Sequence, residues 1–377
     1  MTIKRFSQLC LLTQAMSVAI AQTNLSDNVV SPDVHPDRRV TFRIRAPKAS
    51  EVSLLGDWMD PNKPESMARD ERGLWSITAG PLDPGIAIYN FSVDGLAIPD
   101  PVNPRLKIRA RTSASLVDVP GDPPELWQAR DVPHGKIEIN WEKSNVLGDT
   151  RAYYVYTPPQ NAAERRYGSS GRYPVLYLLH GNNDTAAGWT DAGKANFILD
   201  NLIAEKRAVP MIIVMPWGHA IPYGGAQTNN TAMFERYLIE DVIPQVEKKY
   251  RVKPGRQNRA IVGLSMGGGH SLQIGLDHLE LFSAIGAFSA GVPNNFENRF
   301  KSLLDDPDET NAKLKMLWIG CGKEDSLFER NHKLSELLTS HKIHHTFYPT
   351  EGRHNYAVWR RYLTEVAPTL FRDGGTP

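Results

Sequence analysis

Short stretches of alternating hydrophobic and polar residues characterise the first third of the chain. Residues 40–45, V-T-F-R-I-R, alternate strictly, as expected for a β-strand with one buried face. Turn-rich segments such as D-P-N-K-P and L-D-P-G separate this run from similar ones, and none of the runs has helical periodicity. The other short runs lie at residues 51–58, 73–78 and 86–95. This spacing predicts a small all-β, immunoglobulin-like sandwich.

From residue 137 onward, strands are expected to alternate with helices. Residues 137–143 and 151–157 predict an antiparallel strand pair at the entry to this region. Buried apolar runs then alternate with segments of helical spacing, which is the pattern of βαβ units. The expected strands cover residues 173–180, 211–216, 259–265, 314–320 and 345–349, and the expected helices cover 196–206 and 233–250. The pattern predicts an α/β fold with a mostly parallel sheet and helices on both faces.

The two patterns divide the chain into five expected segments. The proline-rich P-G-D-P-P after Val119 predicts a stiff linker between the sandwich and the α/β region. Leu126 and Trp127 in that linker could pack between the two domains. The expected segments are a signal peptide at 1–21, a flexible leader at 22–35, the sandwich at 36–120, the linker at 121–135 and the α/β domain at 136–373.

The first 21 residues have the features of a secretory signal. Lys4 and Arg5 form a basic start, a moderately apolar stretch follows, and Ala19-Ile20-Ala21 fits the small-x-small cleavage pattern. This predicts a secreted or periplasmic protein, and an N-terminal helix of a cytosolic protein is the alternative. Cleavage would leave Cys321 as the single cysteine, which excludes an internal disulfide, and its apolar surroundings predict a core residue.

Composition and charge narrow the classes of function. The chain has 377 residues, of which 41% are hydrophobic and 23% charged, an ordinary globular composition. A net charge of +1 indicates neither a nucleic-acid partner nor an anionic membrane, and no apolar run approaches the roughly 20 residues of a membrane-spanning helix. No spaced cluster of His, Cys or Asp resembles a set of metal ligands, so no metal or other cofactor is expected. The composition gives no indication of the oligomeric state.

A serine among glycines follows one of the expected strands. Residues 259–269 read R-A-I-V-G-L-S-M-G-G-G, so a G-x-S-x-G motif stands between a strand and a helix-compatible stretch. In such a strand–turn–helix elbow the serine backbone is strained, and Gly263 and Gly267 carry no Cβ that would clash. A plain glycine turn would not explain a serine at its apex. Ser265 is therefore the predicted nucleophile.

A serine nucleophile needs a histidine base that is oriented by an acid, and in α/β-hydrolases these follow in the order Ser, Asp or Glu, His. His354 lies in the loop E-G-R-H-N-Y just past the last expected strand, and it is the predicted base. Asp325 follows the strand at 314–320 and is the predicted acid, although its position would also suit a helix N-cap. The acids that remain as alternatives are Glu324, Asp305, Asp306 and Asp308.

Two backbone N–H groups are expected to bind the negative charge that develops on the ester oxygen. One is that of Met266, the residue after the nucleophile. The other should come from the loop after an earlier strand, where L-L-H-G-N-N-D places Asn182. His180 and Gly181 are expected to shape that loop rather than react.

These motifs resemble carbohydrate esterase family 1, an esterase-D-like branch of the α/β-hydrolases that includes feruloyl, acetylxylan and siderophore esterases and mycolyltransferases. The resemblance covers residues 137–372 and implies an α/β-hydrolase fold in which Ser265, His354 and Asp325 form the triad. It also implies that the amides of Asn182 and Met266 form the oxyanion hole. Gly352-Arg353-His354 departs from the commoner Gly-Gly-His of the family. The matching stretches are L-Y-L-L-H-G with Trp189 behind it, V-M-P-W-G-H, G-L-S-M-G-G-G, W-I-G-C-G-K-E-D-S-L and G-R-H-N-Y-A-V-W-R.

The expected sandwich resembles carbohydrate-binding-module family 48, which occurs beside glycan-active enzymes. The matching residues are Gly56-Asp57-Trp58, Gly73-Leu74-Trp75, the run from Tyr89 to Gly95 and P-D-P-x-N-P from Pro99. Their tryptophans could stack on sugar rings or fill the sandwich core, and the core is favoured for the second of them.

Together, the two resemblances imply a secreted serine esterase of the feruloyl esterase type, which releases hydroxycinnamic acids from plant xylan. Its partner would be an ester-bearing plant polysaccharide or a small aromatic ester. The alternatives are a siderophore esterase, an acetylxylan esterase and, from another class, a glycan-binding protein with an inactive hydrolase domain. Trp217, Tyr223 and Trp189 could line the substrate pocket, and each has a plain packing role as its alternative.

Overall fold

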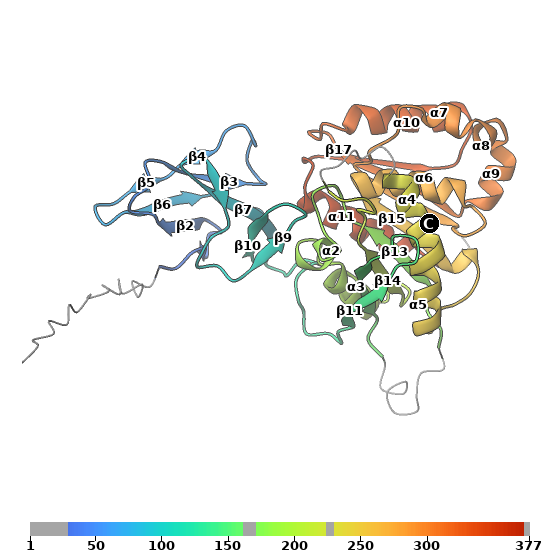
Figure 1. Ribbon diagram of the computed structural model, residues 1–377, viewed down its shortest axis with the longest axis horizontal. Helices are drawn as coiled ribbons and strands as arrows, with labels where there is room; N and C mark the ends of the chain where they lie inside the picture. Colours follow the sequence, from blue (N-terminus) through green and yellow to red (C-terminus); the bar gives the residue numbers. More distant parts are fainter. Residues whose placement is uncertain (1–28, 161–170, 224–229, 373–377) are drawn as a thin grey trace, which may run out of the picture.

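The structure of the protein is a computed structural model that describes residues 29–160, 171–223 and 230–372. The expected signal peptide at 1–21 lies outside the described residues. Figure 1 shows a β-rich N-terminal part beside a larger part that contains the helices. Among the described residues, none of the helices is long and apolar enough to cross a membrane.

The N-terminal part consists of two antiparallel sheets, which confirms the predicted all-β unit. Val40 and Phe42 are completely buried and Ile44 almost so, as the alternation at residues 40–45 predicts. One sheet has the order β1 (Asp33–Val34), β2 (Val40–Arg45), β6 (Leu74–Ala79) and β5 (Ala68–Arg69). The other has the order β4 (Glu65–Ser66), β3 (Val52–Gly56), β7 (Gly85–Val93), β10 (Ser113–Val119) and β9 (Leu106–Ile108), and β8 (Leu96–Ile98) pairs with β7.

The two tryptophans of the sandwich differ in their surroundings. Trp75 belongs to the core and donates its indole N–H to the carbonyl oxygen of Ala46 at 3.0 Å, as the packing alternative predicts. Trp58 is half-buried and stacks on Phe42, with the ring centroids 5.8 Å apart.

The larger part is built on one eight-stranded sheet, which confirms the predicted α/β fold class. The first two strands enter antiparallel, and the others run parallel to one another. The strands from β13 to β17 are almost entirely buried because helices cover both faces. The order is β11 (Lys136–Lys143), β12 (Thr150–Thr157), β14 (Ile212–Pro216), β13 (Val175–Leu179), β15 (Arg259–Leu264), β16 (Ala284–Phe288), β17 (Met316–Gly322) and β18 (Thr346–Thr350).

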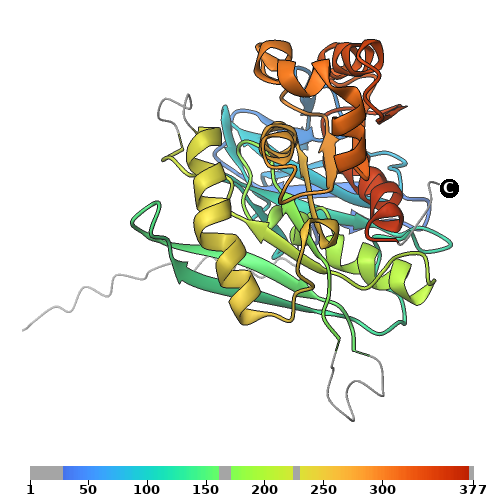
Figure 2. The same cartoon turned by 90° about the vertical axis from the view of Figure 1, so that its right-hand side faces the viewer.

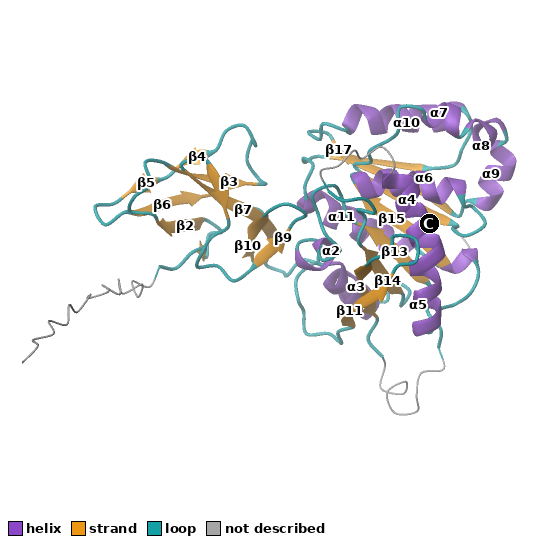
Figure 3. Cartoon of the chain, viewed as in Figure 1, coloured by secondary structure: helices purple, strands orange, loops and turns teal. Residues whose placement is uncertain are grey.

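Helices pack on opposite faces of this sheet. Along β13, Val175 and Tyr177 face one cluster of buried residues, and Leu176 and Leu178 face the other. The first cluster includes α4 (Asn230–Arg236), α5 (Ile243–Lys249), α6 (Met266–Asp277) and α10 (Phe328–Ser340), and the second includes α3 (Ala195–Ala204) and α11 (Tyr356–Val366). Figures 2 and 3 show the helices on both sides of the strands. The shorter helices are α2 (Gly188–Asp191), α7 (Phe296–Arg299), α8 (Lys301–Asp305) and α9 (Pro307–Lys313).

Two elements differ from the expectation. The central strand β16 was not predicted, because A-I-G-A-F is short and lacks both alternation and a bulky β-former at its centre. The helix expected at 233–250 is interrupted by a π-helical segment, Tyr237–Val242, between α4 and α5. Pro244 has no N–H to continue the regular ladder, and the helix widens immediately before it.

The sandwich and the α/β part share one buried apolar cluster. Ile86 and Ile88 of β7 belong to the same cluster as Tyr356 and Trp359 of α11. Leu126 and Trp127 of the linker pack against this cluster, as the sequence suggested they could. The larger part therefore buries one face of the smaller part.

Candidate active site

Ser265 occupies the turn between the carboxyl end of β15 and the first residue of α6. Its backbone is in a strained conformation, with φ 54° and ψ −113°. A Cβ on Gly263 would lie 2.3 Å from the carbonyl oxygen of Gly267, and one on Gly267 would lie 2.5 Å from that of His180. The turn is therefore possible only with glycine at both positions, and it holds the serine at the edge of the sheet.

The structure brings Ser265, His354 and Asp325 together, although they are far apart in the sequence. The Nε2 atom of His354 lies 2.9 Å from Oγ of Ser265, and its Nδ1 atom lies 2.7 Å from Oδ2 of Asp325. The Asp325 side chain is completely buried, whereas 36% of the His354 side chain is exposed. The serine end of the chain of hydrogen bonds thus faces solvent, and the carboxylate end does not.

The partners of Asp325 determine where the protons lie. Burial by itself raises the pKa of its carboxyl group, but the hydrogen bond and charge of His354 outweigh this, so the pKa is lowered. Oδ1 also accepts a hydrogen bond from the backbone N–H of Leu327 at 2.9 Å. An ionised carboxylate can only accept, so Nδ1 of His354 carries the proton and Nε2 is free to accept one from Ser265.

The alternative acids occupy other positions. Glu324 accepts a hydrogen bond from the backbone N–H of Gly352, and so it holds the loop that carries His354 rather than the imidazole. Gly352 has φ +114°, a conformation that favours glycine. Asp306 caps α9, and Asp305 pairs with Lys301 on α8, so these residues are engaged away from the imidazole.

The loop expected to form the oxyanion hole lies against the serine. A Cβ on Gly181 would lie 3.2 Å from Cβ of Ser265, and Asn182 follows in a turn that the Asp184 N–H closes on the Gly181 carbonyl oxygen at 3.3 Å. Met266 begins α6 directly after the serine. The N–H groups of Asn182 and Met266 thus belong to two segments next to Ser265, and their role as the oxyanion hole stays a prediction.

His180 supports this loop. Its Nε2 accepts a hydrogen bond from the N–H of Gly218, and its Nδ1 donates one to the carbonyl oxygen of Gly181, both at 2.8 Å. Burial lowers the pKa of the ring, which favours the neutral form that these two bonds require.

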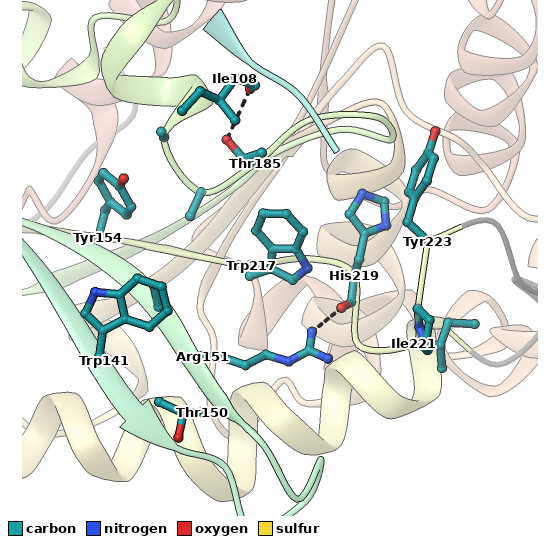
Figure 4. Close-up of a pocket in the computed structure, with 14 residues that line it drawn as sticks. Ile108, Trp141, Thr150, Arg151, Tyr154, Thr185, Trp217, His219, Ile221 and Tyr223 are labelled. Carbon is teal, nitrogen blue, oxygen red and sulfur yellow. Dashed lines mark hydrogen bonds between the residues drawn. The ribbon is translucent and has the colours of Figure 1, made fainter. Parts of the chain in front are cut away.

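An apolar cleft of about 550 Å³ lies next to this loop (Figure 4). Trp217 and Tyr223, two of the predicted pocket residues, line it, whereas the three triad residues do not. Trp189 does not: its side chain is completely buried and donates to the carbonyl oxygen of Leu179 at 3.0 Å, so that prediction is wrong. Three further lining residues were not predicted: Trp141 and Tyr154 from the β11–β12 pair and Ile108 from the sandwich.

His219 forms part of the wall between Trp217 and Tyr223. Among the residues that the structure describes, neither of its ring nitrogens has a hydrogen-bond partner, and burial lowers its pKa to about 4. The ring is therefore neutral near pH 7 and behaves as an aromatic surface, edge-on to Tyr223 with the centroids 4.9 Å apart.

Polar contacts between the sandwich and the loops near Ser265 were not predicted from the sequence either. Lys107 of β9 contacts Asp184 at 2.5 Å, and the Tyr356 hydroxyl donates to the same carboxylate at 2.7 Å. The side chain of Asn355, next to His354, donates to the backbone carbonyl oxygen of Asp57 at 3.1 Å. The sandwich therefore contacts the loops on both sides of Ser265, and no local sequence pattern indicates such long-range contacts.

Known proteins that are similar to this chain include esterases and proteins that contain an esterase region. A family model described as "Putative esterase" matches residues 144–370. An endo-1,4-beta-xylanase/feruloyl esterase from Xylanibacter ruminicola is 30% identical over 346 residues, which cover 90% of this chain and 46% of that protein. The chain spans about half the length of the curated relatives it matches.

Solved structures with the same fold include esterases of two kinds. A family 1 ferulic acid esterase from Anaeromyces mucronatus, in complex with ferulic acid, is 25% identical with a TM-score of 0.54, covering 65% of this chain and 93% of that one. The enterochelin esterase from Shigella flexneri is 18% identical with a TM-score of 0.65, covering 90% and 94%. This second likeness shows a shared fold that extends over both parts of the chain.

Proposed function

The chain belongs to this esterase family, and on that basis we propose that it is a serine carboxylic-ester hydrolase of the feruloyl esterase type. The observation that carries the proposal is the hydrogen-bonded series of Ser265, His354 and Asp325. An aromatic cleft next to the loop at residues 181–184 supports it. The feruloyl esterase relatives support an aromatic acyl group as the part of the substrate that enters the cleft. The proposed reaction releases hydroxycinnamic acid from plant xylan.

The proposed reaction proceeds through an acyl-enzyme. His354 Nε2 takes the proton of Ser265 while Oγ attacks the ester carbonyl carbon, and the N–H groups of Asn182 and Met266 bind the resulting oxyanion. The intermediate collapses as the bond to the alcohol oxygen breaks, and the imidazolium of His354 protonates that oxygen. Water then attacks the acyl-enzyme in the same way, and the acid is released. Asp325 stays ionised throughout and stabilises the imidazolium.

The cleft supports an aromatic acyl group because it offers flat apolar surfaces. Trp217, Tyr223 and Tyr154 line it, and aromatic rings gain most by packing against other rings in tilted or offset arrangements. The N-terminal residues 1–21 have the pattern of a secretory signal, so the proposed reaction takes place outside the cytoplasm, where plant polysaccharide is encountered.

One observation favours a second candidate, a siderophore esterase. The guanidinium of Arg111 lies 4.7 Å from the centre of the Tyr223 ring, so a cation borders the cleft. A cation at this position would suit a large anionic catecholate ester.

A panel of three substrates tests the proposal: methyl ferulate, acetylated xylan and a ferric catecholate ester. We expect the highest kcat/KM on methyl ferulate, and a loss of about a thousandfold or more in the Ser265→Ala variant with an unchanged unfolding temperature. Faster cleavage of the catecholate ester would favour a siderophore esterase over a feruloyl esterase. Activity of Ser265→Ala near that of the parent would contradict the mechanism.

A further inference from the structure

We propose that Lys107, a residue of the N-terminal sandwich, is a positioning residue for the oxyanion-hole loop at residues 181–184. It acts through Asp184, which it contacts across the boundary between the two parts of the chain. The inference rests on the proposed function, because it assigns the loop its role in binding the oxyanion.

The contact between Lys107 and Asp184 is buried and short. Nζ lies 2.5 Å from Oδ1, and the two side chains are only 5% and 8% exposed. Burying an ion pair removes both ions from water at a large cost, so a pair of this kind adds little net stability but resists the removal of either partner. Its main effect is to fix the position of the groups that carry it.

The carboxylate of Asp184 connects three segments. Oδ1 accepts from Nζ of Lys107 and from the backbone N–H of Thr185 at 2.8 Å, and Oδ2 accepts from the Tyr356 hydroxyl. Tyr356 begins α11 two residues after His354. The sandwich, the oxyanion-hole loop and the loop of the base thus meet at one carboxylate.

The same residue closes the turn that contains Asn182. The Asp184 N–H donates to the Gly181 carbonyl oxygen at 3.3 Å, and Asn183 between them has φ 57°. A non-glycine residue at positive φ costs energy, and such a turn persists only where the surrounding contacts hold it. A shift of the Asp184 side chain therefore moves the Asn182 N–H relative to Ser265.

Strand β9 supports the loop along its length. The Thr185 hydroxyl donates to the carbonyl oxygen of Ile108 at 3.3 Å, as Figure 4 shows, and the Ala110 N–H lies 3.4 Å from the carbonyl oxygen of Asn183. The ammonium of Lys107 also lies 4.8 Å from the centre of the Tyr356 ring, so it contacts both the carboxylate and the tyrosine that donates to it.

The pKa of Asp184 is consistent with an ion pair to Lys107. Burial raises the pKa of Asp184, but the charge of Lys107 outweighs it, so the pKa is lowered and the carboxylate stays ionised. Without Lys107, the buried carboxylate would lose the cation that contacts it directly, and it would take up a proton or turn toward water. Either outcome changes the hydrogen bonds that hold the turn.

The test replaces Lys107 by methionine in the full-length chain and measures hydrolysis of p-nitrophenyl acetate. We expect kcat to fall about tenfold or more while KM stays within about twofold, because the oxyanion forms only in the transition state. The affinity of phenylboronic acid, which forms a tetrahedral adduct with a serine, should fall by the same factor.

Lys107→Met combined with Asp184→Asn removes both charges and should recover part of the loss. The control is Arg105→Met, whose exposed partner Asp118 lies within the sandwich, and it should leave kcat unchanged.

Two results would overturn the inference: unchanged kcat and boronate affinity in Lys107→Met, or a fall in the unfolding temperature alone. If that variant does not fold, Lys107→Arg keeps the charge and alters the geometry. A lower kcat at unchanged KM would then support the inference, and parental kinetics would reject it. Failure of the proposed function is distinct, because the parent chain itself would then hydrolyse no ester.

Discussion

The triad residues owe their arrangement to the local backbone at each position. Ser265 has a strained backbone between two glycines, His354 follows Gly352 at φ +114°, and Asp325 follows the end of β17. Each of these positions leaves a trace in the sequence: a G-x-S-x-G motif, a glycine two residues before the histidine, and acids after an apolar run. These three residues were predictable because the backbone conformation at each position depends mainly on its neighbours in sequence.

Asp325 and Glu324 offer a direct test of which carboxylate serves His354. Asp325→Asn should lower kcat by several orders of magnitude, because an amide in place of the carboxylate favours the wrong imidazole tautomer. Glu324→Gln should lower kcat only slightly, because an amide oxygen can still accept from the Gly352 N–H. Steady-state rates on methyl ferulate across pH measure both. If Glu324→Gln were the more impaired variant, the acid would be one residue upstream.

Other residues could not be assigned from the sequence because their partners are distant. Trp189 resembles a pocket residue in its motif, but the helix α2 that carries it turns the indole into the core. Lys107 and Asp184 are 77 residues apart, and neither stands in a pattern of its own. A side chain's direction relative to a cleft depends on packing that periodicity does not encode.

Element types were predictable where the hydrophobic period was regular. The alternating strands of the sandwich and the buried strands of the parallel sheet had clear patterns, whereas β16, with two alanines and a glycine, did not. Gly286 at its centre is required by packing, since a Cβ there would lie 2.9 Å from a Val262 methyl. The close packing of neighbouring strands therefore requires small residues in β16, and small residues do not indicate a strand in a sequence.

The segment after β3 carries a carboxyl group whose ionisation opposes folding. Burial raises the pKa of Asp57 to about 6, well above the value near 3.9 of an unfolded chain. The folded state therefore binds more protons between pH 4 and 6, and stability falls as the pH rises through this interval. Above pH 6 the half-buried carboxylate is charged, and the full cost of its reduced hydration lowers the stability.

Asp57→Asn should accordingly stabilise the protein at high pH. Its amide oxygen can still accept from the Ile88 N–H, which donates to Asp57 at 3.0 Å. We expect a gain of about 1–2 kcal/mol at pH 8 and little change at pH 4, measured by urea unfolding at both values. An equal effect at the two values would show that the carboxyl does not titrate on folding.

At the scale of the whole molecule, the two parts behave as one folding unit. Arg360 of α11 is buried and donates to the carbonyl oxygens of Ile86 and Ala192, one in the sandwich and one in the α/β part. Its guanidinium also lies over the ring of Trp127 in the linker at 5.5 Å. Separating the parts would break the hydrogen bond to Ile86 and the packing of the apolar groups around it, while the bond to Ala192 would remain.

We expect the intact chain to unfold in one cooperative transition in differential scanning calorimetry. A variant that lacks residues 1–120 should unfold several degrees lower and bind a hydrophobic dye, because the face that covers Ile86 and Ile88 becomes exposed. Two separate transitions of the intact chain, one matching the truncated variant, would contradict this expectation. Methyl ferulate hydrolysis by the truncated variant shows how much of the activity depends on the sandwich.

The contact between β7 and α11 also means that, during synthesis on the ribosome, an apolar face of the sandwich is made long before the helix that covers it. The sandwich is complete at residue 119, but the helix that covers Ile86 and Ile88 begins only at residue 356, about 240 residues later. At about 5–20 residues per second, the nascent sandwich exposes this apolar face for roughly 10–50 s. A chaperone that binds hydrophobic surface would therefore act on the chain before its last helix is made, and a message cut short before that helix would yield a protein prone to aggregation.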